Sequence, residues 1–417
     1  MREMKDSGIE WIGQIPNEWK IIQVKYLFKI GRGRVIAQTE LEEKGEYPVY
    51  SSQTKNNGCL GYISTYDFDM SQLTWTTDGA NAGTVFLREG RHNCTNVCGT
   101  LQPLTEYINL TFQKYALEHI AIYHKRADTN GFKIMNNEMA AIHTVCPPIK
   151  EQKKIADYLD NKCSVIDGLI EKQKAVIEKL KEYKMSIITE TVTRGLDLNI
   201  EQKDSGYEFI GMIPATWEVY KLRNIGIPQN GISKGGEYFG HGYPFVSYGD
   251  VYRNYSLPDH VESLIETTEE EREKYSVQKG DIFFTRTSET IEEVGFSSVC
   301  EKTIEDACFA GFLIRVRPIN NLLETEFAKY YFRSNHHREY LAKEMNLVTR
   351  ASLGQDLLKS MIVLIPPMEE QLEIAEYLDC KCTAIDESIS KKQKIINQLL
   401  DYKKSLIYEV VTGKKEV

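Results

Sequence analysis

The chain of 417 residues contains two blocks of sequence that each occur twice. The first block, KDSGIEWIGQIPNEW, begins at Lys5 and returns as KDSGYEFIGMIPATW at Lys203. The second, PPIKEQKKIADYLDNKCSVID, begins at Pro147 and returns as PPMEEQLEIAEYLDCKCTAID at Pro366. The first pair is displaced by 198 residues and the second by 219, so the intervening segments differ in length by 21 residues. The chain is therefore a tandem of two similar frameworks around two dissimilar inserts.

The second repeated block predicts a long amphipathic helix in each half of the chain. Two prolines open each block, and proline suits the first turn of a helix because its missing amide needs no partner there. Apolar residues then recur in steps of three and four for about four heptads, as in the seam of a coiled coil. The predicted seam consists of Leu159, Ile166, Ile170, Ile177 and Leu180 in the first helix and Leu378, Ile385, Ile389, Ile396 and Leu399 in the second.

A narrow seam of this kind needs a partner helix, and the nearest one is the other copy in the same chain. We expect the two helices to pair as an antiparallel coiled coil, and a homodimer through the same seams is the alternative. Roughly 40 residues at ~1.5 Å each give a rod of roughly 60 Å. Each seam carries one polar residue at the same repeat position, Gln173 or Lys392. This residue either sets the register of the helix pair or is tolerated because it lies near a solvent-exposed end of the seam.

The inserts predict two globular domains rich in short strands. Runs of four to six apolar or aromatic residues alternate with Gly, Asn and Asp, as in QLTWTT, GTVFLR and FLIRVRP. We also expect YPFVSYGDV to be a strand and residues 327–345 to be one helix. The predicted class is α/β (α+β), with two globular mixed-sheet domains that are each followed by a long α-helix. The expected divisions are a globular domain at 1–146, a long helix at 147–195, a second globular domain at 196–365 and a second long helix at 366–417.

The loops between the predicted strands carry side chains that suit a polar recognition surface. They supply Gln, Asn, Ser, Thr and Arg with few aliphatic residues, and such side chains hydrogen-bond base edges or phosphates. They also form ordinary turns and helix caps, which is the alternative for any single one. The candidate DNA-binding residues are Ser51, Ser52, Gln53, Lys55, Asn57, Thr77, Asn81 and Lys133 in the first insert and Ser247, Tyr248, Arg253, Arg286, Thr287, Thr349 and Arg350 in the second.

The sequence indicates no catalytic residues, no cofactor and no metal site. It has no P-loop and no glycine-rich fingerprint for a dinucleotide or S-adenosylmethionine. The nine cysteines are irregularly spaced, and we expect them to be free, mostly buried thiols of a reducing cytosol. His336 and His337 stand beside Arg333 and Arg338, and we expect this group to be solvated or to face phosphate.

The charge balance limits the protein's possible partners. The 51 Lys and Arg residues against 60 Asp and Glu residues give a net charge of −9, which counts against a simple nucleic-acid binder. The excess is concentrated in residues 201–365, which hold 25 acidic and 18 basic residues, and above all in the run from Glu262 to Glu273. An acidic run can lie away from a binding face, so the charge does not exclude such a function. Without a run of about 18 apolar residues or an apolar segment near the N-terminus, we expect a cytoplasmic protein.

The layout resembles the specificity subunit of Type I restriction-modification systems, and the resemblance covers essentially the whole chain. The matching residues lie in the repeated blocks. They are Ile12-Gly13, Ile15-Pro16 and Trp19 with Ile210-Gly211, Ile213-Pro214 and Trp217, and Pro147-Pro148, Glu151-Gln152 and Ile155-Ala156 with Pro366-Pro367, Glu370-Gln371 and Ile374-Ala375.

This resemblance implies two target recognition domains that each recognise one half of a split DNA site, mainly in the major groove. The paired helices would fix the gap between the half-sites. They would also carry two modification subunits, which bind S-adenosylmethionine and methylate adenine, and in the full complex two ATP-dependent restriction subunits. The chain itself would be non-catalytic. Two other classes stay open: a stand-alone DNA methyltransferase or nuclease, and a coiled-coil interaction adaptor without DNA specificity.

Overall fold

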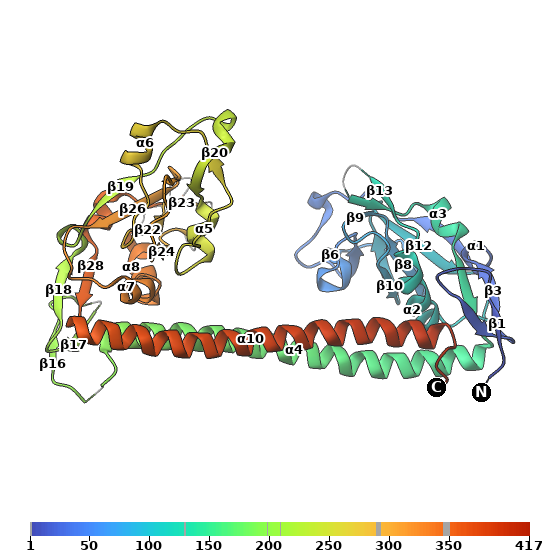
Figure 1. Ribbon diagram of the computed structural model, residues 1–417. Helices are drawn as coiled ribbons and strands as arrows, with labels where there is room; N and C mark the ends of the chain where they lie inside the picture. Colours follow the sequence, from blue (N-terminus) through green and yellow to red (C-terminus); the bar gives the residue numbers. More distant parts are fainter. Residues whose placement is uncertain (1, 129–130, 198, 209, 289–292, 345–350) are drawn as a thin grey trace. The chain divides into compact units, whose positions relative to one another are not determined.

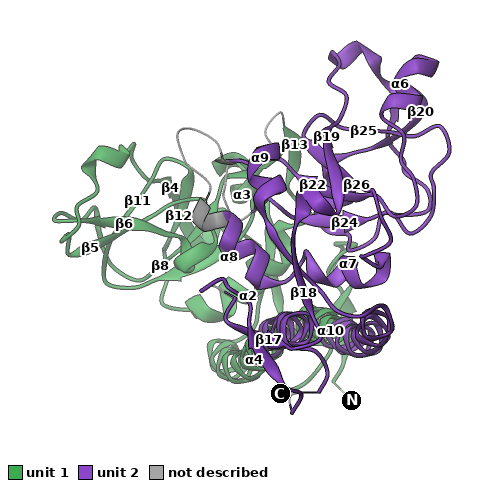
Figure 2. Cartoon of the chain, turned by 90° about the vertical axis from the view of Figure 1, so that its left-hand side faces the viewer, with its two compact units in different colours: residues 1–174, 393–417 green, residues 175–392 purple. Residues whose placement is uncertain are grey.

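The computed structural model describes residues 2–128, 131–197, 199–208, 210–288, 293–344 and 351–417, which form two compact units. Unit 1 consists of Met1–Lys174 together with Gln393–Val417, and unit 2 consists of Ala175–Lys392. Two long helices, α4 (Ile149–Arg194) and α10 (Met368–Val411), follow the two Pro-Pro pairs as the sequence predicts. Each unit contains a part of both helices, as the two colours of Figure 2 show.

The globular part of unit 1 is built on two four-stranded sheets. One is antiparallel throughout, in the order β10-β8-β12-β4, and helix α2 packs against β8 and β10 (Figure 1). The other, in the order β6-β5-β11-β7, is mixed, because β11 runs parallel to β5. The bounds are β1 (Met4–Asp6), β2 (Gln14–Pro16), β3 (Lys20–Gln23), α1 (Val24–Leu27), β4 (Phe28–Arg32), β5 (Tyr47–Tyr50), β6 (Cys59–Ile63), β7 (Phe68–Asp69), β8 (Gln72–Thr76), β9 (Asp78–Gly79), β10 (Val85–Arg88), β11 (Arg91–Cys94), β12 (Cys98–Pro103), α2 (Leu110–Ala121), β13 (Arg126–Asp128), β14 (Gly131–Lys133), α3 (Asn136–Ala141) and β15 (His143–Cys146).

Unit 2 repeats the strand order of the antiparallel sheet although its insert has a dissimilar sequence, and its mixed sheet has three strands where that of unit 1 has four. Its antiparallel sheet has the order β24-β22-β26-β19, and β20 runs parallel to β25 as β5 does to β11. The bounds are β16 (Gln202–Asp204), β17 (Met212–Pro214), β18 (Glu218–Lys221), β19 (Gly226–Asn230), β20 (Phe239–Val246), α5 (Tyr248–Arg253), β21 (Leu264–Ile265), α6 (Glu269–Lys274), β22 (Ile282–Thr285), β23 (Thr287–Ser288), β24 (Ser297–Val299), β25 (Cys308–Phe309), β26 (Leu313–Pro318), α7 (Thr325–Tyr331), α8 (Asn335–Glu344), β27 (Ala351–Ser352), α9 (Gln355–Ser360) and β28 (Ile362–Ile365). The predicted mixed α/β class is confirmed.

The centre of each antiparallel sheet is a strand that is buried along its whole length. In β8 the sequence QLTWT is buried at every position, and the Trp75 indole donates to the carbonyl of Ile134 at 3.0 Å. In β22 the sequence IFFT is likewise buried throughout. Because both faces of these strands are covered, their hydrophobic surface holds the sheet and its helices together.

The repeated blocks join the globular part of each unit to a long helix. The buried Trp19 donates its indole N–H to Glu151 Oε2 at 2.9 Å, and the buried Trp217 donates to Glu370 Oε2 at the same distance. The neighbouring glutamine is also buried in both copies. Gln371 donates to the carbonyls of Pro366 and Leu322 and accepts from the amide of Glu324, and Gln152 makes the equivalent three bonds in unit 1. The repeated Pro-Pro-x-x-Glu-Gln motif thus satisfies backbone groups where sheet and helix meet.

The predicted seam residues lie on the least exposed stripe of each long helix. In unit 1 the buried ones are Leu159, Ile166, Ile170 and Ile396, and Leu399 is half-buried. In unit 2 they are Ile177, Leu378 and Ile385, with Leu180 and Ile389 half-buried.

One ion pair links α4 and α10 within each unit. In unit 1, Lys403 Nζ of α10 lies 2.7 Å from Asp167 Oδ2 of α4. In unit 2, Lys184 Nζ of α4 lies 2.6 Å from Asp386 Oδ2 of α10. The two pairs use the same repeat positions, because Lys184 precedes Lys403 by 219 residues and Asp167 precedes Asp386 by the same number.

Two predicted elements of unit 2 are wrong. The predicted strand YPFVSYGDV ends at Val246, and α5 follows it because Ser247 caps the helix and Asp250 completes a capping box. The predicted single helix at 327–345 is interrupted between α7 and α8, where the amides of Arg333 and Ser334 bond to carbonyls three residues back.

Candidate nucleic-acid interface

The first group of candidate residues follows β5 in unit 1. Ser51 is half-buried, and its hydroxyl accepts a hydrogen bond from Thr95 Oγ1 at 3.2 Å. Ser52 and Gln53 are also half-buried, and the Gln53 amide donates to the carbonyl of Cys59. Lys55 and Asn57 are exposed. In this segment, therefore, the residues nearest β5 support the loop, whereas Lys55 and Asn57 are accessible to a ligand.

The second group lies where β8 ends. Thr77 is buried, and its hydroxyl contacts Asp78 Oδ2 at 2.6 Å. Asn81 is exposed. Lys133 Nζ lies 2.5 Å from Asp128 Oδ2 and 3.6 Å from Asp78 Oδ1. The hydrogen bond with Asp128 and the charge of that carboxylate raise the pKa of Lys133. Thr77 is thus enclosed in the fold, and the Lys133 charge is largely balanced by acidic neighbours.

The structure brings these two groups together at one end of the unit 1 sheets. The turn between β11 and β12 lies between them, because Thr95 bonds to Ser51 and the carbonyl of Val97 accepts from the amide of Thr77 at 3.2 Å. Loops from β5, β8 and β11 therefore meet at a single surface in unit 1.

In unit 2 the candidates that follow β20 lie on the short helix α5. Ser247 is its N-cap, and its hydroxyl accepts from the amide of Asp250 at 3.4 Å, which is the ordinary capping role. Tyr248 is half-buried, donates its hydroxyl to the carbonyl of Glu293 at 3.0 Å and stacks on Tyr252. Arg253 is exposed at the end of the helix. Of the three, Arg253 is the most accessible to a ligand.

The remaining candidates of unit 2 follow β22. Arg286 and Thr287 are half-buried, and Thr287 pairs with Ser352 across β23 and β27. Thr285, which precedes Arg286, lies near Tyr248, because the carbonyl of Glu293 accepts from both Tyr248 and Thr285. Thr349 and Arg350 lie outside the described residues.

Two buried arginines support these loops, and of the two only Arg88 was not singled out from the sequence. Arg88 on β10 is 1% exposed and donates to the carbonyl of Asn57 at 2.7 Å, and burial lowers its pKa. Arg333, after α7, is 5% exposed and donates to the carbonyls of Val251 and Asn254 at 2.6 Å each. Burial lowers the pKa of Arg333 to about 10. A charged residue at an inward position of a predicted strand, as in GTVFLR, was the available signal for Arg88.

The prediction that Arg333 and His337 are solvated or face phosphate is wrong. His337 is 2% exposed, its ring packs against Tyr331 and Phe332, and burial lowers its pKa well below the ordinary value. Both residues are therefore part of the protein interior.

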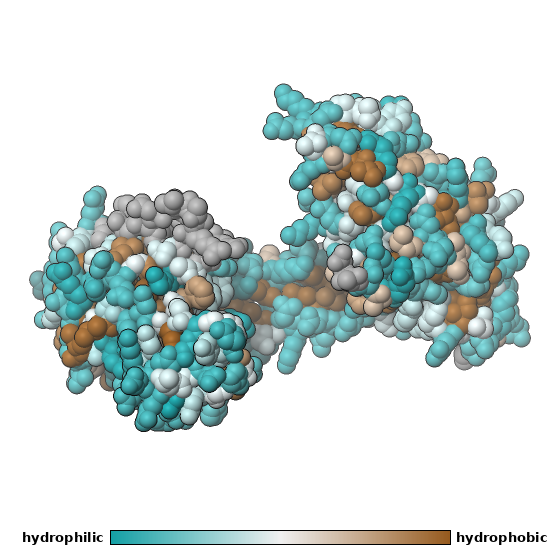
Figure 3. Space-filling model, turned by 90° about the horizontal axis from the view of Figure 1, so that it is seen from above, coloured by the Kyte–Doolittle hydropathy of each residue, from teal (hydrophilic) through white to brown (hydrophobic). Residues whose placement is uncertain are grey.

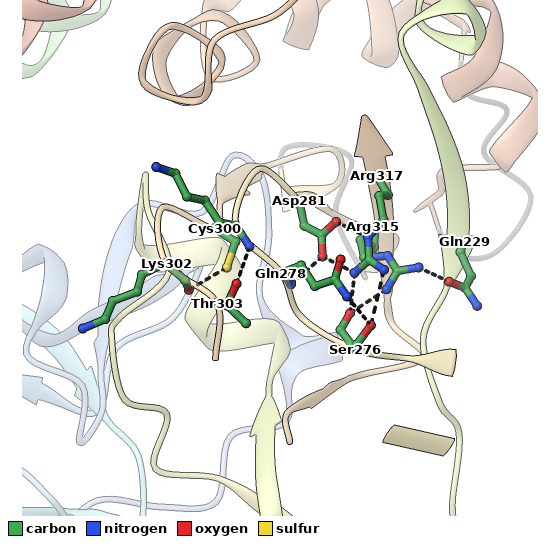
Figure 4. A network of polar contacts seen from close by, with 10 residues as sticks. Gln229, Ser276, Gln278, Asp281, Cys300, Lys302, Thr303, Arg315 and Arg317 are labelled. Atoms are coloured by element: carbon green, nitrogen blue, oxygen red, sulfur yellow. Dashed lines mark hydrogen bonds and ion pairs between the residues drawn. The ribbon is translucent and has the colours of Figure 1, made fainter. Parts of the chain in front are cut away.

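Two further arginines of unit 2, both on β26, are held in a polar network (Figure 4). Arg317 forms a bidentate ion pair with the buried Asp281, with Nε–Oδ1 at 2.7 Å and Nη2–Oδ2 at 2.6 Å. Arg315 is nearly buried, donates to the carbonyl of Ser276 at 2.5 Å and bonds to Gln229. These cations stabilise the loop before β22 and are not displayed for phosphates.

The faces of the two units turned away from the long helices are mostly hydrophilic, with scattered hydrophobic residues (Figure 3). Among the residues that the structure describes, no group of three or more His, Cys, Asp or Glu side chains could hold a metal ion. Nor is any helix within the described ranges long and apolar enough to span a membrane. The nine cysteines are free, and six of them are buried.

Comparisons with known proteins identify the family. The family model for the Type I restriction modification DNA specificity domain matches residues 16–179 and 214–400. A Mycoplasma pneumoniae chain described as the N-terminus of a type I specificity subunit is 42% identical over 142 residues, which cover 34% of this chain and 76% of that one. The specificity subunit of the type I restriction enzyme MjaVIII of Methanocaldococcus jannaschii is 25% identical over 419 residues, 97% of this chain and 94% of that one.

A solved structure from a study of complex assembly and conformational transition of the type I R-M system has the same fold. It has a TM-score of 0.70 at 13% sequence identity and covers 95% of this chain and 98% of its own. The family model matches one stretch in each half of the chain and most of its length in total. The protein therefore belongs to the family of Type I restriction-modification specificity subunits, which recognise DNA.

Proposed function

We propose that this chain is the non-catalytic subunit that recognises a bipartite DNA site for a Type I restriction-modification complex. The observation that carries the proposal is that two dissimilar inserts form a four-stranded antiparallel sheet with the same strand order in unit 1 and unit 2. Each framework carries its own set of polar loop residues, and different loops on a common framework suit two different half-sites. Each unit would recognise one half-site, mainly in the major groove, where every base pair presents a distinct pattern.

The two long helices would set the distance between the half-sites as one antiparallel coiled coil. The ion pairs Lys403–Asp167 and Lys184–Asp386 support this arrangement, since position 167 of α4 faces 403 and the later position 184 faces the earlier position 386. Helices of 46 and 44 residues rise about 69 and 66 Å at ~1.5 Å per residue. This exceeds one turn of B-DNA, about 34 Å, so the units could bind separated half-sites.

The same helices would carry two modification subunits, joined in the full complex by two restriction subunits. Exposed apolar residues recur seven positions apart on one face of each helix, as Val176 and Tyr183 in unit 2 and Ile395 and Tyr402 in unit 1. The two pairs occupy the same repeat positions, 219 residues apart. Exposed apolar residues beside an already buried seam favour a protein partner, and two equivalent patches suit two copies of one partner.

Mapping of methylated bases in host DNA by long-read sequencing tests this function. We expect methylated adenines within a two-part motif whose halves are separated by a spacer of fixed length. The control is a strain in which only this gene is deleted, and it should lose that motif alone. If the methylation pattern is unchanged after deletion, the proposal is wrong.

Assays of the purified chain separate the proposal from its two alternatives. Without partner subunits, we expect no methyl transfer from S-adenosylmethionine and no DNA cleavage with Mg²⁺ and ATP. Turnover by the chain alone would support a methyltransferase or nuclease. Absence of any DNA sequence preference, with or without partners, would instead support a coiled-coil adaptor.

A further inference from the structure

The turn at Lys55–Gly58 in unit 1 has an uncommon backbone. Three consecutive residues have positive φ angles: 50° at Asn56, 53° at Asn57 and 79° at Gly58. Asparagine and glycine are the residues that adopt this left-handed region most readily. A Cβ atom at Gly58 would lie 2.8 Å from Arg88 Nη2, so a larger residue there would displace the guanidinium and would also strain the backbone at this positive φ. The sequence Asn-Asn-Gly therefore matches the backbone that the turn requires.

Arg88 holds this turn from inside the unit. Its guanidinium lies between the rings of Tyr50 and Phe86, 3.6 and 4.3 Å from their centroids. Arg88 Nε donates to Thr74 Oγ1 at 3.0 Å, and Nη1 donates to the carbonyl of Asn57 at 2.7 Å. One buried side chain thus connects the central strand β8 to the tip of the turn.

The side chains of the turn point to solvent while its main chain is held. Lys55, Asn56 and Asn57 are all exposed. Among the described residues, neither asparagine side-chain amide has a hydrogen-bond partner, in contrast to the engaged side chains of Ser51 and Thr77. An asparagine amide can donate to and accept from adenine at once, and a fixed backbone lowers the entropy cost of placing it.

We propose that Asn56 and Asn57 contact bases of the half-site recognised by unit 1, and that Arg88 is the positioning residue of this turn. The inference rests on the proposed function and specifies which loop recognises the bases. Lys55, on the same turn, would contact phosphate, which contributes affinity without sequence preference.

The experiment selects DNA from a pool of duplexes with a randomised central segment, using the full chain and then each variant. The wild-type chain should enrich a two-part motif. Asn57→Asp keeps the shape and the tolerance for positive φ but removes the amide donor, so one base preference in one half should change. Asn56→Gly and Asn57→Gly keep the backbone and remove the side chain, and discrimination at one position should fall roughly 5- to 160-fold, the loss of one bidentate contact. Asn17→Asp, an exposed site in the same unit, is the charge-matched control.

Arg88→Met tests the positioning role, because methionine fills the space between the two rings but bonds to neither Thr74 nor Asn57. We expect discrimination to fall in the same half that Asn57→Asp alters, with the other half unchanged. Arg88→Lys can still donate to one of the two acceptors, so it should lose less base discrimination than Arg88→Met does. Thermal unfolding and circular dichroism of each variant show whether unit 1 remains folded. If Arg88→Met unfolds unit 1, Arg88→Lys tests the positioning role and the asparagine variants test the base contacts.

The outcomes distinguish this inference from the function on which it rests. A two-part motif that stays the same in the asparagine variants overturns the inference and leaves the proposed function intact. Equal weakening of both halves in the Arg88 variants overturns the positioning role. If the wild-type chain enriches no motif, either alone or with its partner subunits, both the proposed function and this inference fail.

Discussion

Glu151 and Glu370 occupy the same position of the repeat, and each accepts a hydrogen bond from a tryptophan indole. Only Glu151 also accepts a hydrogen bond from an arginine, Arg2. Burial alone raises the pKa of Glu151, but hydrogen bonds from Arg2 and Trp19 outweigh it and lower the pKa below its ordinary value. Glu370 accepts the equivalent bond from Trp217, yet burial dominates and its pKa is raised. The contribution of Glu151 to stability is therefore present above its unfolded pKa and is lost as the pH falls through its folded pKa. The contribution of Glu370 is present below its unfolded pKa and is lost as the pH rises through its folded pKa.

This asymmetry predicts different titrations for two tryptophan indoles. In a ¹H–¹⁵N spectrum the Trp19 indole signal should shift with a midpoint below the ordinary pKa of glutamate, about 4.3, and the Trp217 signal with a midpoint above it. Arg2→Ala should move the Trp19 midpoint upwards and leave that of Trp217 unchanged. Trp75, which donates to a backbone carbonyl, is the control and should not titrate in this range. Equal midpoints for Trp19 and Trp217 would contradict the assigned role of Arg2.

At the scale of elements, sequence reasoning succeeded where one periodic signal extended over many residues. The heptad pattern located α4 and α10, and QLTWTT and FLIRVRP predicted β8 and β26 closely. It failed where a local contact overrides the pattern, because the cap at Ser247 converts a predicted strand into α5. For the candidate surface, the sequence predicted which polar residues lie in the loops, but not which of their side chains are exposed. The Asn57 main chain is held by Arg88, and the Thr77 hydroxyl is enclosed against the carbonyl of Val97, and both partners are distant in the sequence.

The reciprocal ion pairs give a prediction for the register of the long helices. Lys184→Glu would place two negative charges where Lys184 and Asp386 now lie 2.6 Å apart, so unit 2 should be destabilised. Adding Asp386→Lys should restore stability, with a coupling of about 0.2–1 kcal/mol in a double-mutant cycle, since Asp386 is largely exposed. Hydrogen exchange of the helical segments of unit 2 measures the effect, and those of unit 1 serve as the internal control.

The homodimer alternative is checked with the same variants. Light scattering should give a mass near 47.9 kDa for the wild type and for the charge-reversed double variant. If the chain is monomeric and the double-mutant cycle shows a coupling, Lys184 and Asp386 form their ion pair within one molecule. A dimeric mass together with the same coupling would instead favour pairing between chains.

At the scale of the whole molecule, the division of both helices between the units permits a direct test of the proposed spacing role. The units divide after Lys174 in α4 and after Lys392 in α10. One heptad inserted at both points leaves the sequence inside each unit unchanged, and a seven-residue repeat returns the seam to the same side of the helix. The added length is about 10.5 Å at ~1.5 Å per residue, which matches about three base pairs at ~3.4 Å each.

The expected result is a selected DNA motif with the same two halves and a spacer about three base pairs longer. Three base pairs also rotate one half-site by roughly 100° around the DNA axis, whereas the heptad hardly rotates the helix face. The DNA must therefore twist to fit, so we expect weaker binding to the new motif than the wild type shows for its own. A heptad inserted in α4 alone is the matched control, and it should destabilise the helix pair because α4 would then be one heptad longer than α10 between the two units, so the ion pairs Lys403–Asp167 and Lys184–Asp386 could not both form. An unchanged spacer in the doubly extended chain would mean that the helices do not determine the distance between the half-sites.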